Sequence, residues 1–100
     1  MIVIHRRDRH RYPGRTLVYL TRGTLWGNPH PHGTPCGRCH VVHTRAQCIE
    51  AFRQDWESPA WEAKRARALR ELPGTVGLCW CAPEPCHGQV IADYVNAQTP

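Results

Sequence analysis

The segment Cys79–His87 combines the side chains with the most chemistry in this chain, three thiols and an imidazole. Cys81 and Cys86 flank a loop that two prolines stiffen, and His87 follows Cys86 directly. Thiolates and imidazoles act as nucleophiles, carry protons and bind zinc. An apolar run precedes the segment and an amphipathic run follows it, which places Cys86 and His87 at an expected helix N-terminus. There, free N–H groups and the helix dipole favour a thiolate or a bound anion.

Three interpretations of this segment are open. Cys81, Cys86 and His87 can be metal ligands, or the cysteines can be buried thiols that shape the loop. In the third interpretation, Cys86 is a catalytic nucleophile with a lowered pKa, and His87 is its acid or base. Adjacent side chains on a helix point in different directions, so a histidine of another loop, His30 or His32, would be a better partner for Cys86.

A second group of potential metal ligands lies earlier in the chain. Cys36 and Cys39 are separated by two residues in a glycine-containing turn, the spacing with which two thiolates bind one tetrahedral Zn²⁺ ion. With His43 and Cys48 as further ligands, the pattern is C-x2-C-x3-H-x4-C. It has one residue fewer before the histidine than a nucleic-acid zinc knuckle. We therefore predict a Zn²⁺ cofactor bound by these four residues.

The identity of the third and fourth ligands is open. Cys48 falls on the same predicted helix stripe as Ile49 and Phe52, so it can equally be a core residue. Other candidates are an imidazole of the same loop and the ligand-type residues of the C-terminal segment: His40, Cys81, Cys86 and His87. A site that joins distant segments would stabilise the fold more, because its binding energy is folding energy.

The loop after the second predicted strand has residues suited to a ligand. Arg22 offers a planar fork for phosphate or carboxylate, and Gly23 lets the backbone approach a ligand closely. Trp26 can stack on a base, and Asn28 can bind a polar edge. This combination is typical of a nucleotide or nucleobase pocket. A structural interpretation is open beside it, with Trp26 in the core and Asn28 in a turn before Pro29.

Local patterns predict the elements that position these residues. β-forming runs predict three strands: Ile2–Ile4, Thr16–Leu20 and Thr75–Trp80. Thr44 and Gln47 form a capping box that begins a helix. Ser58 and Pro59 predict the cap and first-turn proline of a second helix. The spacing of apolar residues after position 86 predicts a third.

The order of these elements predicts one small α/β domain over residues 1–100. Its short, partly parallel sheet is flanked by about three helices, with a long Cys/His-containing loop over residues 21–43. In such sheets, ligands bind beyond the carboxyl ends of the strands. Two of these ends lead into Arg22 and Cys86, so we expect both loops to meet on one side of the sheet.

Positive charge is concentrated at the N-terminal end. The chain has a net charge of +5, and residues 1–25 contain six arginines against a single acidic residue, Asp8. We expect residues 1–14 to form a flexible basic segment. It can lie along a phosphate backbone, or it can be a solvated turn.

The N-terminal residues also bear on the compartment. Met1–Ile4 is followed at once by arginines, the reverse of a secretory signal. No apolar run reaches the roughly 20 residues of a membrane span. We therefore expect a cytoplasmic protein with no membrane partner. In the cytoplasm, six cysteines indicate metal ligands or reactive thiols. In an oxidising compartment, disulfides would explain the same count.

Two sequence blocks resemble a known family. They are Tyr19-Leu20-Thr21-Arg22-Gly23 with Trp26-Gly27-Asn28-Pro29, and Leu78-Cys79-Trp80-Cys81-Ala82-Pro83-Glu84-Pro85-Cys86-His87-Gly88. Together with a central helix that carries Phe52 and Trp56, they look like a small bacterial and phage domain of unknown function. The motifs of that family are GR…WGNP and CWC-x-P-x-x-CHG, and the resemblance covers residues 15–96. This chain departs from the family pattern by an insertion at Cys36–His40. The resemblance implies a fold and two loops marked by the family motifs, and no activity.

Three functional hypotheses follow. The first is a zinc-binding α/β protein that binds a nucleotide-like or nucleic-acid ligand at the Arg22 and Cys86 loops. The second is a thiol- or metal-dependent enzyme that acts on a nucleoside or nucleobase. The third is a regulatory interaction protein without catalysis. The chain has no G-x-G-x-x-G or G-K-[ST] motif, which disfavours a standard dinucleotide or triphosphate site.

Overall fold

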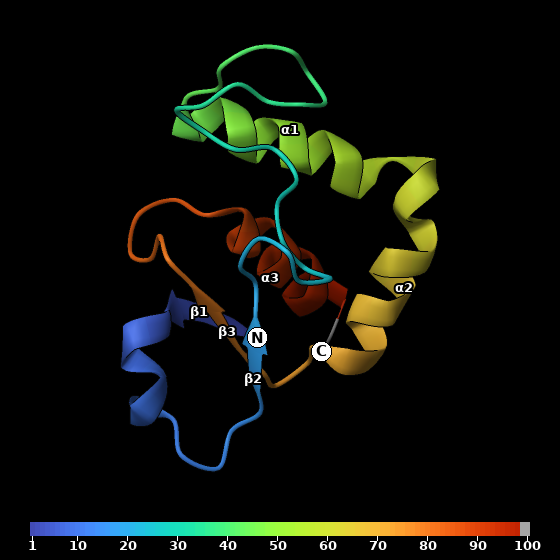
Figure 1. Ribbon diagram of the computed structural model, residues 1–100. Coiled ribbons are helices and arrows are strands. Elements are labelled where there is room, and N and C mark those ends of the chain that lie inside the picture. The colour runs from blue at the N-terminus through green and yellow to red at the C-terminus, as the bar shows by residue number, and fades with distance from the viewer. Residues whose placement is uncertain (99–100) are drawn as a thin grey trace.

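The computed structural model describes residues 1–98 (Figure 1), so the last two residues of the expected domain 1–100 lie outside the described part. The strands are β1 (Ile2–His5), β2 (Leu17–Tyr19) and β3 (Val76–Cys79). The α-helices are α1 (Arg45–Glu57), α2 (Glu62–Glu71) and α3 (His87–Gln98). Two 3-10 helices complete the fold, η1 (Arg6–Arg11) and η2 (Pro59–Trp61). The order of the elements confirms the predicted small α/β class.

All three strands run parallel, in the order β1-β3-β2, although the sequence predicts only a partly parallel sheet. Val76 of the central strand pairs with Ile2 on one side and Leu17 on the other. Every residue of β3 is buried, which accounts for its continuous apolar run. Because parallel strands end at the same edge, the segments that follow β1, β2 and β3 all begin at one edge of the sheet.

The capping box of α1 is confirmed. The Thr44 hydroxyl accepts the N–H of Gln47 at 3.2 Å, and the Gln47 side chain accepts the N–H of Thr44 at 2.9 Å. Ser58 occupies the N-cap position of η2, but the predicted capping bond of its side chain is absent. The Ser58 hydroxyl donates to the carbonyl of Asp55 at 2.7 Å, which terminates α1, and no side chain caps η2 or α2. Pro59 does occupy the first turn, but of η2.

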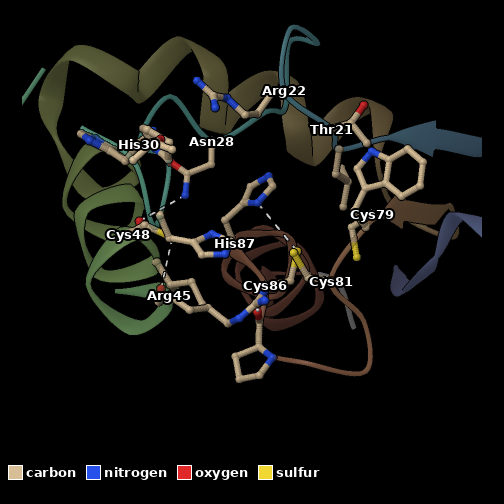
Figure 2. A pocket seen from close by; sticks show the side chains of 17 residues that line it. Thr21, Arg22, Asn28, His30, Arg45, Cys48, Cys79, Cys81, Cys86 and His87 are labelled. Atoms are coloured by element: carbon tan, nitrogen blue, oxygen red, sulfur yellow. Dashed lines mark hydrogen bonds between the residues drawn. The ribbon is translucent and has the colours of Figure 1, made fainter. Parts of the chain in front are cut away.

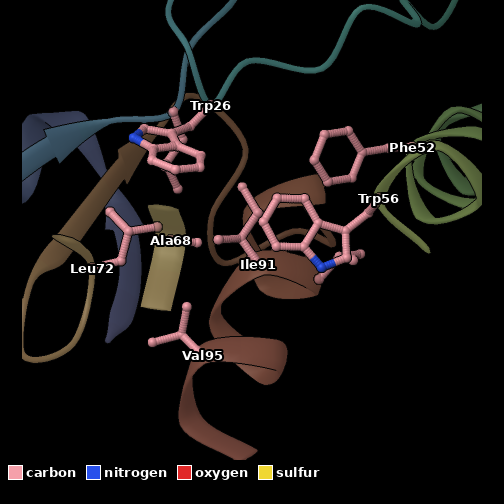
Figure 3. Close-up of a cluster of buried hydrophobic side chains, with 9 residues drawn as sticks. Trp26, Phe52, Trp56, Ala68, Leu72, Ile91 and Val95 are labelled. Atoms are coloured by element: carbon pink, nitrogen blue, oxygen red, sulfur yellow. The ribbon is translucent and has the colours of Figure 1, made fainter. Parts of the chain in front are cut away.

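Helix α3 lies at the centre of the fold and packs against α1, α2 and β1 (Figure 1). One apolar core joins these elements, and Figure 3 shows its main side chains: Trp26, Phe52, Trp56, Ala68, Leu72, Ile91 and Val95. Leu20, directly after β2, fills the space beside Gly88 of α3. A Cβ at Gly88 would lie 2.6 Å from Leu20 Cδ1, so the glycine allows the first turn of α3 to approach the end of β2.

The basic N-terminal segment contains regular structure. Residues 2–5 pair with β3, and residues 6–11 form η1, within the segment 1–14 for which the sequence predicts flexibility. The pairing of β1 with the buried central strand supplies backbone hydrogen bonds that a basic composition does not reveal. No helix among residues 1–98 has the length and apolar character needed to cross a bilayer.

Candidate metal centre and adjoining cavity

Four metal-binding side chains gather in the loop between β2 and α1: His30, Cys36, Cys39 and His43. Their ligand atoms all lie within 4.8 Å of one another. Three of the residues are buried and Cys39 is exposed. Two thiols and two imidazoles are a common ligand set for a tetrahedral metal ion. This group can therefore hold a metal.

A tight turn places the two thiols together. The N–H of Cys36 donates to the carbonyl of Val41, and the N–H of His40 donates to the carbonyl of Cys36, each at 2.8 Å. His40 adopts a left-handed backbone conformation with φ of 62°. The N–H of Gly33 donates to the carbonyl of His43 at 2.9 Å, which brings the second histidine to the base of the turn.

His30 is held from two sides. Its Nε2 lies 2.7 Å from Asp55 Oδ2 in α1, and its Nδ1 lies 3.4 Å from both Cys36 Sγ and Cys39 Sγ. When Nε2 carries the proton and donates it to the carboxylate, the lone pair of Nδ1 faces the thiols. Metal-bound histidines usually have such a carboxylate or carbonyl on the second ring nitrogen. The Asp55–His30 pair therefore has the arrangement of a metal ligand and its support.

Asn28 positions His30. Its Oδ1 accepts the N–H of His30 at 2.8 Å, and its Nδ2 donates to the carbonyl of Cys48 in α1 at 3.1 Å. The asparagine is 8% exposed, so these two bonds satisfy a buried amide. They also tie the loop to α1 just before the first histidine of the cluster.

His43 provides independent support for a metal. Its Nε2 is buried and has no hydrogen-bond partner among residues 1–98. Its ring lies edge-on to that of His30, with 5.9 Å between the centroids. Buried polar atoms are nearly always paired because leaving one unpaired costs about 1–3 kcal/mol. A metal ion bound within the cluster would give this nitrogen its partner.

The pKa values of the two thiols of the cluster are shifted in opposite directions. Burial raises the pKa of Cys36, but hydrogen bonds, above all the one from the backbone N–H of Cys39, outweigh this effect and lower the pKa to about 6. Burial raises the pKa of Cys39, and the hydrogen bond with Cys36 raises it further. The site thus favours a thiolate at Cys36 before any metal binds, and thiolates are the form that binds metals.

A cavity of about 330 Å³ lies beside the cluster (Figure 2). Residues from the ends of β2 and β3, the long loop, α1 and α3 line it, among them Arg22, His30, Arg45 and Cys86. Because Arg22 and Cys86 border the same cavity, the prediction that their loops meet on one side of the sheet is confirmed. The shared residue His30 links the cavity to the metal cluster.

Cys79 and Cys86 form a second thiol pair in this cavity. The hydrogen bond from Cys86 lowers the pKa of Cys79 to about 6, and the N–H of Ala82, 3.3 Å from the Cys79 sulfur, adds to the effect. The same hydrogen bond, together with burial, raises the pKa of Cys86. The lowered pKa thus belongs to Cys79 and the raised pKa to Cys86.

His87 is held in one tautomer. Its Nε2 lies 2.9 Å from the carbonyl of Trp26, so Nε2 carries the proton, and Nδ1 lies 3.7 Å from Cys86 Sγ. Burial lowers the pKa of His87, which keeps the ring neutral near pH 7. The ring also lies against Phe52, with 4.9 Å between the centroids. His87 thereby joins α3 to the loop and to α1.

Comparison with known proteins places the chain in a family. A family model described as a domain of unknown function (DUF4326) matches residues 2–97. The chain belongs to the DUF4326 family. It is 34% identical over 87 residues to an uncharacterized 12.4 kDa protein of the nrdA-td intergenic region in Enterobacteria phage T4. The match covers 86% of this chain and 73% of the phage protein. No solved structure matches.

In this DUF4326 domain, three of the four predicted metal ligands come together: Cys36, Cys39 and His43. Cys48 does not join them. The capped first turn of α1 fixes the direction of the Cys48 side chain. The Cys48 Sγ donates to the carbonyl of Arg45 at 3.1 Å, and the residue borders the cavity. His30 occupies the fourth place. The alternative ligands also lie outside the cluster, and of these Cys81, Cys86 and His87 line the cavity.

The predicted ligand-binding residues of the DUF4326 domain lie in different surroundings. Arg22 and Asn28 line the cavity, but the side chain of Asn28 is engaged with the loop and α1. Trp26 is 6% exposed and packs in the core. Gly23, with φ of 84°, lies in the adjacent turn and borders a separate depression. Arg22 is exposed, and it borders both this cavity and the depression beside Gly23.

Sequence reasoning missed His30 as a potential metal ligand and considered it only as a partner of Cys86. One sequence signal for this role is that His30 lies close before the two cysteines. The four residues of the cluster follow the pattern H-x5-C-x2-C-x3-H. The stronger indication, its contact with Asp55, is invisible in a local pattern because 25 positions separate the two residues.

Metal analysis of variants tests the four ligands. His30→Ala removes an imidazole from the cluster, so we expect zinc affinity to fall by more than about 10-fold. Cys48→Ser is the matched control and should retain wild-type zinc content, since its sulfur lies outside the cluster. Native mass spectrometry and competition with a chromogenic chelator measure both. Loss of zinc in Cys48→Ser with retention in His30→Ala would contradict this assignment.

Proposed function

We propose that this DUF4326 domain is a zinc-binding α/β protein whose cavity binds a nucleotide-like ligand. The zinc ligands are His30, Cys36, Cys39 and His43. Four protein ligands fill a tetrahedral ion, which is the arrangement of structural zinc sites. The observation that supports zinc most directly is the unpaired, buried Nε2 of His43 inside a cluster of two thiols and a supported imidazole.

The zinc ion would fix the long loop. Residues 21–43 contain no helix and no strand of the sheet, so separate turn hydrogen bonds hold them in place instead of a continuous ladder. A metal bound here joins the turn at Cys36 to His30 and, through Asp55, to α1. Because the ligands are brought together only by folding, the binding free energy contributes to the stability of this arrangement.

The cavity supports a nucleotide-like ligand by its size and by its charges. Its volume of about 330 Å³ is at the lower end of the usual range for small-molecule sites. Arg22 and Arg45 border it from two different elements, and their guanidinium groups suit a phosphate. Apolar side chains, including Leu20 and Ile49, form much of the remaining wall and suit a flat base.

Titration calorimetry tests the nucleotide. Wild-type protein is titrated with the four ribonucleoside monophosphates and with inorganic phosphate. We expect one mononucleotide to bind with 1:1 stoichiometry, and Arg22→Ala to weaken it by about 10- to 100-fold, the effect of losing one charge-assisted hydrogen bond.

Arg53→Ala is the matched control for Arg22, because Arg53 is exposed on α1 and pairs with Glu50 away from the cavity. The Arg53→Ala variant should bind the mononucleotide with wild-type affinity. Absence of binding by any mononucleotide, or an equal loss in both variants, would overturn the nucleotide part of the proposal and leave the zinc part standing.

A second candidate function, a thiol enzyme acting on a nucleoside-type substrate, is favoured by one observation. The Cys79–Cys86 pair has one lowered and one raised pKa in a cavity, as expected of a nucleophile and its hydrogen-bond donor. The sequence assigns the nucleophile to Cys86. The raised pKa of Cys86 instead favours Cys79 in that role.

The pH dependence of the Cys79 thiolate tests this pair. Its folded pKa of about 6 lies below the ordinary value of 9.0, so the thiolate should persist as pH falls from 9 towards 6 and be lost below that. Cys86→Ala removes the hydrogen bond and should shift the titration upward. The ultraviolet thiolate absorbance, with Cys79→Ser as the blank, measures this. An unchanged midpoint in Cys86→Ala would count against the pair.

A further inference from the structure

The carboxyl ends of the three strands carry an exposed group of aromatic and basic side chains. They are His5 at the end of β1, Arg6 directly after it, Tyr19 at the end of β2 and Trp80 after β3. The Arg6 guanidinium lies 4.2 Å from the ring centroid of Trp80 and 5.7 Å from that of Tyr19. His5 meets Trp80 edge-on at 6.0 Å. We call these four residues the Arg6–Trp80 platform.

The platform is open to solvent on a face that no element of the described fold covers completely. Trp80 is 61% exposed even with Arg6 against its ring, and Tyr19 is 42% exposed. Side chains alternate along a strand, so Tyr19 shares its sheet face with Leu17, which is also exposed. The opposite face of the sheet packs on α3. An exposed tryptophan beside further exposed apolar groups is a typical interaction surface.

The charge around the platform is strongly positive. Helix η1 follows β1 directly and contains four arginines, Arg6, Arg7, Arg9 and Arg11, with Asp8 as its one acidic residue. The remaining acidic residues lie at positions 50–93. Two copies of this surface would repel each other, which disfavours a symmetric dimer through it. A polyanion with flat apolar groups matches both the charge and the rings.

We propose that the Arg6–Trp80 platform binds single-stranded nucleic acid, with an unpaired base stacked on Trp80 or Tyr19 and phosphates on the arginines of η1. Aromatic rings beside a basic surface are the means by which proteins hold single strands without reading sequence. Bases within a duplex are already stacked on one another, so a single strand is the preferred partner. This site is separate from the proposed mononucleotide cavity, although Trp80 borders both.

Fluorescence anisotropy with labelled oligothymidylate and oligouridylate of about 16 nucleotides tests the proposal. Wild-type protein should bind, and the same sequence in a duplex should bind more weakly. Tyr19→Ala and Trp80→Ala should each weaken binding by about 5- to 100-fold, the effect of losing one stacked base. The two oligonucleotides show whether a DNA or an RNA strand is preferred.

Two matched controls separate stacking and charge from general surface effects. Val42→Ala truncates an apolar side chain of the loop 21–43 that is 57% exposed. This variant should bind the oligonucleotide with wild-type affinity. Arg7→Ala should reduce the slope of log affinity against log salt by about 0.7, the value for one phosphate contact on a single strand. Arg53→Ala on α1 should not change this slope.

Tyr19 does not line the cavity, so Tyr19→Ala should bind mononucleotides as the wild type does. This distinguishes failure of the platform from failure of the proposed cavity. The proposal is overturned by absence of binding at about 100 µM protein and low salt. Equal effects of Tyr19→Ala and Val42→Ala, or tighter binding of the duplex, would also overturn it. A different result in sedimentation would also overturn it: wild-type protein forms a dimer, and Trp80→Ala is a monomer that binds the oligonucleotide as before.

Discussion

The hydrogen bond between His30 and Asp55 is the contact on which the functional face of this DUF4326 domain depends. It joins a long loop without a helix or a strand of the sheet to α1, at a distance of 2.7 Å between Nε2 and Oδ2. It also sets the direction of the imidazole, so that Nδ1 meets both thiols of the turn. Asn28 reinforces the same junction through two buried hydrogen bonds. This junction fixes His30, which belongs both to the four-residue cluster and to the wall of the cavity.

The parallel sheet provides the second constraint. Three parallel strands end at one edge, so the residues that follow them are neighbours although they are far apart in the chain. On one side of this edge lie the cavity and the thiols of the C-terminal segment. On the other lies the Arg6–Trp80 platform. One topological feature thus concentrates sulfur, imidazole, guanidinium and indole groups in a small part of the surface.

Local patterns in the sequence predict the strands, the α1 capping box and the turn of Cys36 and Cys39, because each depends on neighbours a few positions away. They fail where a contact spans the fold. Cys48 has suitable spacing for the fourth ligand, but the capped start of α1 turns it towards the cavity. His30 is held in the cluster by Asn28 and by Asp55 of α1, and Asp55 is 25 positions away in the sequence. Ser58 has the sequence of a helix cap, yet its hydroxyl satisfies the preceding helix instead.

X-ray absorption at the zinc edge of the purified protein measures the central claim most directly, because it counts the sulfur and nitrogen neighbours of the ion. The arrangement around His30 predicts two sulfur atoms at about 2.3 Å and two imidazole nitrogens at about 2.0–2.1 Å. Three sulfur neighbours would show that another cysteine, such as Cys48, displaces His30. Such a spectrum, or one in which water oxygens replace the imidazoles, would contradict the account.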